Sequence, residues 1–206
     1  MSRTQRVGRK VMARSTREQA RATADAILAS AHELFSCRSY SSVSLEDIAG
    51  AAGVTRGALY HHFGSREGLF SRVHDDVQAA IAAAIDAATL DIDDPVEGLR
   101  VGSRVFLAAS VSTDARQVLL LDAPSVLGWD RWRDSDAANS GRQLLSVLVE
   151  LKAAGRLRSG EPEATSALLS GGMNELALWV AHSDDVPAAL DRAQIALSSL
   201  VDGVIE

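Results

Sequence analysis

Apolar residues recur every three or four positions along most of the chain, which is the spacing of amphipathic helices. A first stripe consists of Ile27, Leu28, Ala31, Leu34 and Phe35. A second stripe runs from Leu69 to Ile85 through alanine-rich sequence, which favours one long helix. Aromatic residues make up only 4% of the chain and prolines number four, as is usual for helical proteins. We therefore predict an all-α protein.

Capping residues and prolines indicate where later helices begin and end. Asp94-Pro95-Val96-Glu97 supplies a capping Asp, a first-turn Pro and an acidic third residue. A helix from Asp114 to about Asp122 is predicted to stop before Pro124. One long helix, which follows residues 126–132, is predicted to end at Ala154-Gly155. Two final helices are expected at about 162–182 and 185–204.

The stretch from Ser44 to Phe63 predicts two short helices joined by a tight turn. Ser44 can cap the first helix, with Asp47 beside its positive N-terminal end. Gly53 stands where a left-handed residue is needed, and Thr55 begins the second helix almost at once. A turn this short makes the two helices cross at a steep angle. The pattern is a helix-turn-helix.

The second of these helices has two unlike faces. Leu59 and Phe63 are predicted to point into the core. The outer face is rich in hydrogen-bond donors, has no acidic residue, and consists of Thr55, Arg56, Gly57, Tyr60 and His61. Such a face suits a DNA major groove. The alternative is a helical hairpin with a solvated face, used as a protein-interaction module without sequence-specific DNA binding.

Four motifs follow one another between Ile27 and Val73. They are Ala31-x-x-Leu34-Phe35, Ser44-Leu45-Glu46-Asp47-Ile48-Ala49, the run from Ala52 to Phe63, and Glu67-x-Leu69-Phe70. Together they closely resemble the DNA-binding domain of TetR-family repressors. The resemblance covers about the first third of the chain. It implies a homodimeric, effector-responsive regulator, usually a repressor, that reads a palindromic operator in double-stranded DNA.

The resemblance also implies roles for individual residues. Contacts to the DNA backbone are expected from Ser44, Thr55, Tyr60 and His62, and contacts near base edges from Arg56, Gly57 and His61. We expect Arg56 to contact guanine, because a guanidinium can pair with both O6 and N7. Arg66, at the start of the following helix, is expected to hold a phosphate.

Charge is distributed unevenly along the chain, whose formal net charge is −6. Residues 1–74 hold 11 Lys and Arg against 6 Asp and Glu, whereas residues 75–206 hold 10 against 21. Residues 1–21 hold seven of the basic side chains and one acid, so they are either an arm that follows DNA or a solvated tail. We expect a basic arm (1–21), a three-helix DNA-binding domain (22–74), and a helical effector-binding and dimerisation domain (75–206) joined to it by a long helix.

The last two predicted helices have the composition of a dimer interface. The first is apolar nearly all round, and the second has apolar residues at heptad-like steps. Both could pack within one chain, but a regulator that reads two half-sites favours a bundle formed by two subunits. The expected interface residues are Leu168, Leu169, Gly172, Leu176, Leu190, Ala193, Leu197, Leu200 and Val204.

The scarce aromatic residues provide candidates for an effector pocket. Three tryptophans and a methionine can line an adaptable apolar cavity, although helical cores also contain such residues. The apolar candidates are Phe106, Trp129, Trp132, Met173 and Trp179, with Asp122, Asn174, Glu175 and His182 as polar contacts. We expect a small apolar or amphipathic effector.

The sequence offers little for catalysis, a cofactor or a metal. It has no Gly-x-Ser-x-Gly elbow, dinucleotide-binding glycine loop or Cys-x-x-Cys, and His32-Glu33 lacks the second His of a zinc-protease helix. Cys37 is the only cysteine, which fits a reducing compartment. No apolar run is long enough to cross a membrane. We therefore expect a cytoplasmic protein that is not an enzyme.

Overall fold

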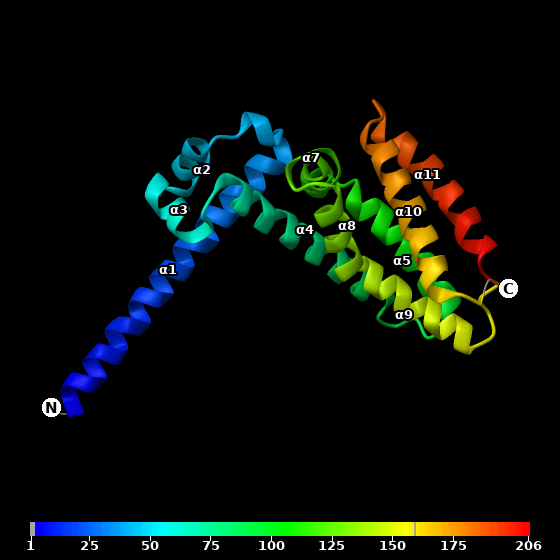
Figure 1. Ribbon diagram of the computed structural model, residues 1–206, viewed down its shortest axis with the longest axis horizontal. Helices are drawn as coiled ribbons and strands as arrows, with labels where there is room; N and C mark the ends of the chain where they lie inside the picture. Colours follow the sequence, from blue (N-terminus) through cyan, green and yellow to red (C-terminus); the bar gives the residue numbers. More distant parts are fainter. Residues whose placement is uncertain (1–2, 159) are drawn as a thin grey trace. The chain divides into compact units, whose positions relative to one another are not determined.

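The computed structural model describes the backbone of residues 3–158 and 160–206, and the side chains of residues 18–158 and 160–206. In this part of the chain every regular element is a helix, and the only β pairing is an isolated antiparallel bridge between Leu157 and Ile205 (Figure 1). The predicted all-α fold class is confirmed. None of the described helices is long and apolar enough to cross a membrane.

The chain divides into two compact units, residues 1–73 and residues 74–206. The first unit contains α1 (Arg3–Cys37), a 3-10 turn (Tyr40–Ser42), α2 (Leu45–Ala52), α3 (Arg56–Phe63) and the beginning of α4 (Arg66–Thr89). Its core residues are Ile27, Ala31, Phe35, Val43, Ile48, Leu59, Leu69, Phe70 and Val73. Phe35 and Phe70 meet edge to face, with ring centroids 5.2 Å apart. Cys37 is exposed at the end of α1.

The predicted basic arm does not form a segment separate from the first helix. The backbone is helical from Arg3, and α1 continues without a break to Cys37. An uninterrupted helix therefore joins residues 3–21 to the apolar stripe that begins at Ile27, and their role as an arm along DNA stays a prediction. The side chains of the basic residues before Glu18 lie outside the described residues.

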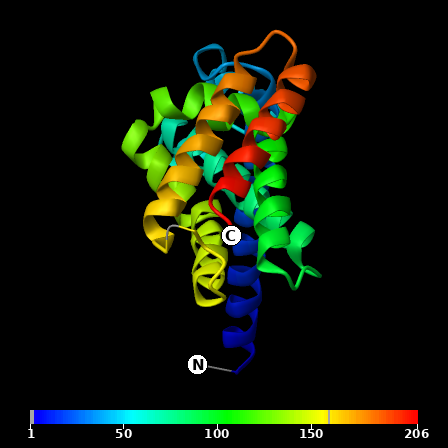
Figure 2. The same cartoon turned by 90° about the vertical axis from the view of Figure 1, so that its right-hand side faces the viewer.

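The second unit contains the remainder of α4 and the helices that follow it. These are α5 (Pro95–Ser110), α6 (Thr113–Arg116), a π-helix (Gln117–Asp122), α7 (Ala123–Val126), α8 (Trp129–Ala138), α9 (Ser140–Ala153), α10 (Pro162–Ala181) and α11 (Val186–Gly203). Helices α5, α9, α10 and α11 pack against one another, and α10 and α11 lie side by side (Figures 1 and 2). Their core includes Leu99, Phe106, Leu107, Leu148, Leu151, Leu169, Ala177 and Leu197.

Two of these helices begin at aspartate caps, of which the sequence analysis predicts the one at Asp94. The Asp94 carboxylate accepts the Val96 N–H at 3.4 Å, and Pro95 occupies the first turn of α5. The Asp185 carboxylate accepts the Ala188 N–H at 3.1 Å at the start of α11. Each carboxylate satisfies an N–H that has no partner within its helix.

The segment between residues 113 and 139 differs from the prediction. The helix expected to stop before Pro124 consists of α6, the π-helix and α7, and Pro124 lies in the first turn of α7. Proline is tolerated in a first turn because its missing N–H would have no helical partner there.

The long helix expected after this segment is divided into α8 and α9 at Asn139, whose φ of −108° and ψ of −102° are not helical. The Asn139 Nδ2 donates to the Ser135 carbonyl at 2.8 Å, and the side chain thereby takes the acceptor that a continuing helix would need.

Candidate DNA interface and effector cavity

A reciprocal capping box fixes the start of α2. The Asp47 N–H donates to Ser44 Oγ at 3.0 Å, and the Ser44 N–H donates to Asp47 Oδ2 at 2.9 Å. The Ser44 hydroxyl also donates to Asp47 Oδ2, at 2.8 Å. These bonds favour the carboxylate and hold the pKa of Asp47 below its usual value. Since the hydroxyl proton of Ser44 is already donated to Asp47, the cap leaves it no second proton for a DNA phosphate.

A left-handed glycine turns the chain from α2 into α3. Gly53 has φ of 66° and ψ of 30°, and a Cβ at this position would meet no atom within 4 Å, so the requirement for glycine is conformational. The Val54 N–H then donates to the Ala49 carbonyl at 3.0 Å, and Thr55 Oγ1 accepts the Ala58 N–H at 3.3 Å. The predicted helix-turn-helix, with Thr55 as the second cap, is confirmed.

The outer face of α3 is open to solvent. Leu59 is buried, whereas the exposed residues are Thr55, Arg56, Gly57, Tyr60 and His61. His62 and Phe63 are half-buried, so Phe63 contributes less to the core than the sequence predicts. A Cβ on Gly57 would meet only Thr55 Oγ1, at 3.8 Å, which leaves the start of α3 accessible at the backbone.

Arg56 is held between α2 and α3 by two neighbours that reasoning from the sequence did not pair with it. Its guanidinium forms an ion pair with Glu46, and Nη2 donates to the Tyr60 hydroxyl at 3.1 Å. The hydrogen bond to Tyr60 and the charge of Glu46 raise the pKa of Arg56 above its ordinary value. Glu46 and Arg56 are ten residues apart, and only the crossing of the two helices brings them together.

Arg66 has contacts within the chain, and the phosphate contact expected for it stays a prediction. Its Nη1 donates to the Val43 carbonyl at 2.9 Å, and its guanidinium lies 4.1 Å from the centre of the Tyr40 ring. These contacts join the start of α4 to the segment that precedes α2. The contact with Tyr40 favours this packing because a cation over an aromatic face is stabilised by the ring quadrupole.

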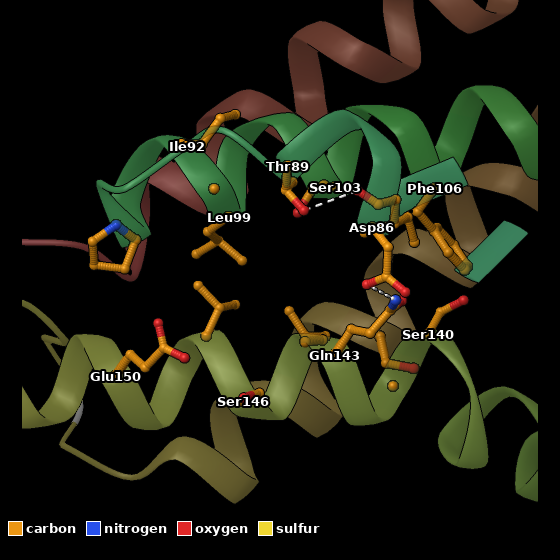
Figure 3. A pocket seen from close by; sticks show the side chains of 18 of the residues that line it. Asp86, Thr89, Ile92, Leu99, Ser103, Phe106, Ser140, Gln143, Ser146 and Glu150 are labelled. Carbon is orange, nitrogen blue, oxygen red and sulfur yellow. Dashed lines mark hydrogen bonds between the residues drawn. The ribbon is translucent and has the colours of Figure 1, made fainter. Parts of the chain in front are cut away.

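The second unit contains a cavity of about 330 Å³ with walls from α4, α5, α9 and α10 (Figure 3). Its apolar walls include Ile85, Ile92, Leu99, Leu144 and Val147. Of the residues predicted to contact an effector, Phe106 and Met173 line this cavity. A volume of this size and these walls are suited to a small organic molecule.

The three tryptophans do not line the cavity. Trp132 is buried in the core, where Nε1 donates to the Leu119 carbonyl at 2.8 Å. Trp129 is largely exposed and packs on Trp132, with ring centroids 4.8 Å apart. Trp179 is exposed on α10, with the Arg192 guanidinium 4.9 Å from its ring centre. Spacing along a helix does not reveal which face adjoins a cavity, so the sequence could not show that these three side chains lie away from this one.

The polar candidates also lie elsewhere. The Asp122 carboxylate accepts from Gln117 Nε2 at 3.0 Å, and Glu175 and His182 are exposed on or just after α10. Asn174 is buried behind the cavity wall, where its Nδ2 donates to Asp136 Oδ2 at 2.9 Å. The polar residues that do line the cavity, which the sequence analysis missed, include Asp86, Asp136, Ser140 and Gln143. They come from three helices, and no local sequence signal groups them.

Helices α10 and α11 expose an apolar surface of the second unit. Leu168 and Ile195 are 59% and 70% exposed, and Trp179 is 42% exposed. Leu169, Ala193 and Leu197 of the predicted dimer interface are instead buried within the single chain, because α10 and α11 pack on each other and on α5. The remaining predicted residues are half-buried and comprise Gly172, Leu176, Leu190, Leu200 and Val204.

A capped helix-turn-helix with a donor-rich second helix, accompanied by a helical unit that encloses a cavity, defines a class of protein, the helix-turn-helix transcriptional regulators. The chain belongs to the TetR family of these regulators. Residues 27–73 match "Bacterial regulatory proteins, tetR family", and residues 96–204 match "Tetracyclin repressor-like, C-terminal domain". Regulators of this family bind DNA as dimers and respond to small-molecule ligands.

Individual relatives agree with this assignment. A solved TetR-family transcriptional regulator from Pectobacterium atrosepticum is 31% identical, with a TM-score of 0.81 over 92% of this chain and 97% of its own. The transcriptional regulator AcrR of Shigella flexneri is 37% identical over 110 residues, which are 53% of this chain and only 51% of AcrR. The TetC protein of transposon Tn10 from Escherichia coli is 23% identical over 85% of this chain and 87% of its own. The relatives are regulators, and none of these three is described as an enzyme.

Proposed function

We propose that two copies of this chain form a homodimeric, ligand-responsive repressor that binds a palindromic operator in the cytoplasm. The observation that carries this proposal is the exposed, donor-rich face of α3, positioned by the capping box of α2 and the turn at Gly53. A dimer related by a twofold axis presents two such helices to the two halves of a palindrome.

We assign base reading to the start of α3. Arg56, Gly57 and His61 are exposed there, and a guanidinium that leaves Glu46 can pair with guanine. Thr55, Tyr60 and His62 are assigned to the DNA backbone, with Ser44 acting through its cap on α2. Arg66 is also assigned to the DNA backbone, through guanidinium N–H groups that its bond to Val43 leaves available.

We assign dimerisation to the outer surface of α10 and α11, defined by Leu168, Trp179 and Ile195. Large apolar side chains grouped on one face indicate an interaction site, and covering them would remove apolar area from water. The close approach of α10 and α11 supports a rigid surface, since a Cβ on Gly172 would lie 2.8 Å from Leu200 Cδ2.

We place the effector in the cavity bounded by α4, α5, α9 and α10. An effector changes operator affinity only if it binds the operator-competent and the released conformations unequally. The cavity supports this role because α4, which forms one of its walls, is the same continuous helix whose first turns contribute Leu69, Phe70 and Val73 to the DNA-binding unit.

Gel retardation on DNA upstream of the chain's own gene tests the proposal. The full chain should retard this fragment in excess random DNA, and a variant that places a bulky acid on α3, Gly57→Glu, should not. Gly50→Ala, an exposed change on α2, serves as the matched control and should retard normally. If the chain retards the upstream fragment no better than a random DNA fragment of the same length, or retards neither, the helical protein-interaction module is supported instead.

A further inference from the structure

The wall of the cavity carries negative charge and no positive charge. Four carboxylates line it, those of Asp86, Asp93, Asp136 and Glu150, and the described lining residues include no Lys, Arg or His. Asp86, Asp93 and Glu150 are exposed and lie toward solvent, whereas Asp136 is only 4% exposed. The cavity therefore combines acidic groups near solvent with one carboxylate deep in its wall.

Asp136 is a buried carboxylate whose partners are neutral. It accepts from Ser170 Oγ at 3.0 Å and from Asn174 Nδ2 at 2.9 Å, and it forms no ion pair with any described residue. Removing a carboxylate from water is costly unless a positive charge compensates it. Two neutral donors hold Asp136 in place and leave its charge uncompensated.

Three basic residues near the cavity, two on α5 and one just after α9, are already used in other ion pairs. Arg100 on α5 lies 2.9 Å from Asp202, Arg104 lies 3.6 Å from Glu97, and Arg156 pairs with Asp94. These pairs hold the three guanidinium groups on carboxylates outside the cavity lining. The protein itself therefore supplies no counter-charge to the cavity from these three side chains.

One end of the cavity is rich in hydrogen-bond acceptors. Asp86 and Gln143 face each other there, with Gln143 Nε2 donating to Asp86 at 2.6 Å, and Ser140 and Phe106 lie at the same end (Figure 3). Gln143 Oε1 and Ser140 Oγ are buried and have no hydrogen-bond partner among the described residues, and Ser140 as a whole is 94% buried. Gln143 Oε1 can only accept, and Ser140 Oγ can accept or donate, so both are suited to a ligand that brings N–H groups.

The other end of the cavity has apolar side chains in its wall, together with the carboxylate of Glu150 (Figure 3). Ile92 and Leu99 lie there, away from Asp86 and Gln143 (Figure 3). A hydrocarbon or aromatic body in this end would be removed from water, while Phe106 presents a ring to a positive charge at the opposite end. Asp86, Gln143 and Phe106 suit a positive charge at one end, and Ile92 and Leu99 suit an apolar body at the other.

We propose that the effector of this regulator is an amphipathic organic cation, an ammonium group attached to an apolar body. The ammonium lies at the end formed by Asp136 and the Asp86–Gln143 pair, and the apolar body packs on Leu99 and its neighbours. That the bound cation regulates operator binding rests on the proposed function. The preference of the cavity for cations rests only on its own residues, so the two can fail separately.

Calorimetric titration of the full chain with three molecules of one skeleton tests this inference. The probes are 4-phenylbutylamine, 4-phenylbutan-1-ol and 4-phenylbutyrate at neutral pH, which present a cation, a neutral group and an anion. The amine should bind at least about tenfold more tightly than the alcohol, as for a charge-assisted contact, and the carboxylate should not bind measurably. Equal or tighter binding of the alcohol or the carboxylate overturns the proposal, and so does the absence of binding by all three.

Two variants locate the selectivity. Asp136→Asn and Asp86→Asn should each reduce the preference for the amine while leaving the affinity for the alcohol unchanged. Asp134 is an exposed carboxylate on the same helix as Asp136, so Asp134→Asn is the matched control and should retain the preference for the amine. If circular dichroism shows that Asp136→Asn is unfolded, the exposed Asp86→Asn decides alone. Retained amine preference in both folded variants overturns the assignment.

Operator binding separates this inference from the proposed function. If the amine binds selectively but the chain does not retard its upstream DNA, the cavity assignment stands and the regulatory role fails. If the chain retards DNA and the amine does not bind preferentially, the regulatory role stands and the cationic effector is wrong. A drop in retardation on adding the amine, absent with the alcohol, supports both.

Discussion

The guanidinium of Arg56 cannot contact a base while it remains paired with Glu46. In the free chain this pair and the bond to Tyr60 hold the side chain across the outside of α2 and α3. An exposed ion pair contributes little to stability, so little free energy is lost when Arg56 leaves Glu46 for a guanine. In the proposed operator complex, Glu46 would orient Arg56 before DNA binds and would repel phosphate in a variant that lacks Arg56.

Arg56→Ala should weaken operator binding by about 1–3 kcal/mol and relax the preference at one base pair in each half-site. The reason is the loss of a bidentate contact to one base, with Glu46 left unpaired nearby. Competition titrations against operators changed one base pair at a time measure both effects. If affinity falls equally for every sequence, Arg56 contacts only phosphate, and base reading would then be assigned to His61.

A second residue-scale feature is the buried histidine on α4. His74 is almost completely buried, and its Nδ1 lies 3.5 Å from the Asp75 carboxylate, beyond a normal hydrogen bond. Burial lowers the pKa of His74 below its ordinary value of 6.5, Asp75 opposes this shift, and Arg131 adds to it. The folded chain therefore holds His74 neutral at pH values where the unfolded chain is already protonated.

The melting temperature should fall as the pH decreases below about 6.5, because the unfolded state then binds more protons than the folded state. The loss should level off once the pH is below the lowered pKa of folded His74. His74→Leu should flatten this part of the profile, measured by thermal unfolding between about pH 5 and pH 8. His61→Gln, an exposed histidine, is the control. An unchanged slope in His74→Leu would assign the effect to other groups.

At the scale of elements, the sequence predicts the helix starts that have local caps, and it names two of those caps, Ser44 and Asp94. Ser44, Asp94 and Asp185 each cap a helix with their own side chain, and Gly53 adopts the left-handed conformation that its position requires. These features depend on residues within four positions of one another. The break at Asn139 and the π-helix at 117–122 depend on how the second unit packs, so local reasoning missed them.

Gly53→Ala should destabilise the DNA-binding unit by roughly 1–2 kcal/mol, because a Cβ at φ of 66° is strained even in open space. Gly50→Ala is the matched substitution, since this glycine lies on the exposed face of α2 with helical backbone and free space. It should stabilise the same unit by up to about 1 kcal/mol. Urea unfolding of the two variants measures the contrast. A Gly53→Ala chain as stable as the parent would show that the turn tolerates a side chain.

At the scale of the whole molecule, the DNA-binding surface was predictable and the cavity was not. The residues of α3 follow one another in sequence, so the 3.6 residues of each helical turn are enough to predict which of them share a face. The cavity combines Asp86 from α4, Leu99 from α5, Asp136 from α8 and Gln143 from α9, which are up to 57 positions apart. No sequence pattern specifies such a set, and the search for aromatic residues selected Trp129, Trp132 and Trp179 instead.

Replacing Leu168 and Ile195 by Glu should give a folded monomer that loses tight operator binding. Both side chains are exposed in the single chain, so the charges disrupt only contacts with a second copy. Leu197→Glu differs, because Leu197 is buried and the change should unfold the second unit. Light scattering combined with circular dichroism distinguishes the two. A Leu168→Glu, Ile195→Glu chain that remains a dimer would place the interface elsewhere.

The single exposed thiol at Cys37 makes the separation of the two DNA-reading units directly measurable. A maleimide or nitroxide reagent can react with one known position per chain, and this position belongs to the same unit as α3. A dimer then carries two identical reporters without an engineered cysteine. Pulsed dipolar spectroscopy gives the distribution of distances between the two labels in the free protein, with operator, and with a bound amine. A shift between these distributions would measure how far the two DNA-binding units move.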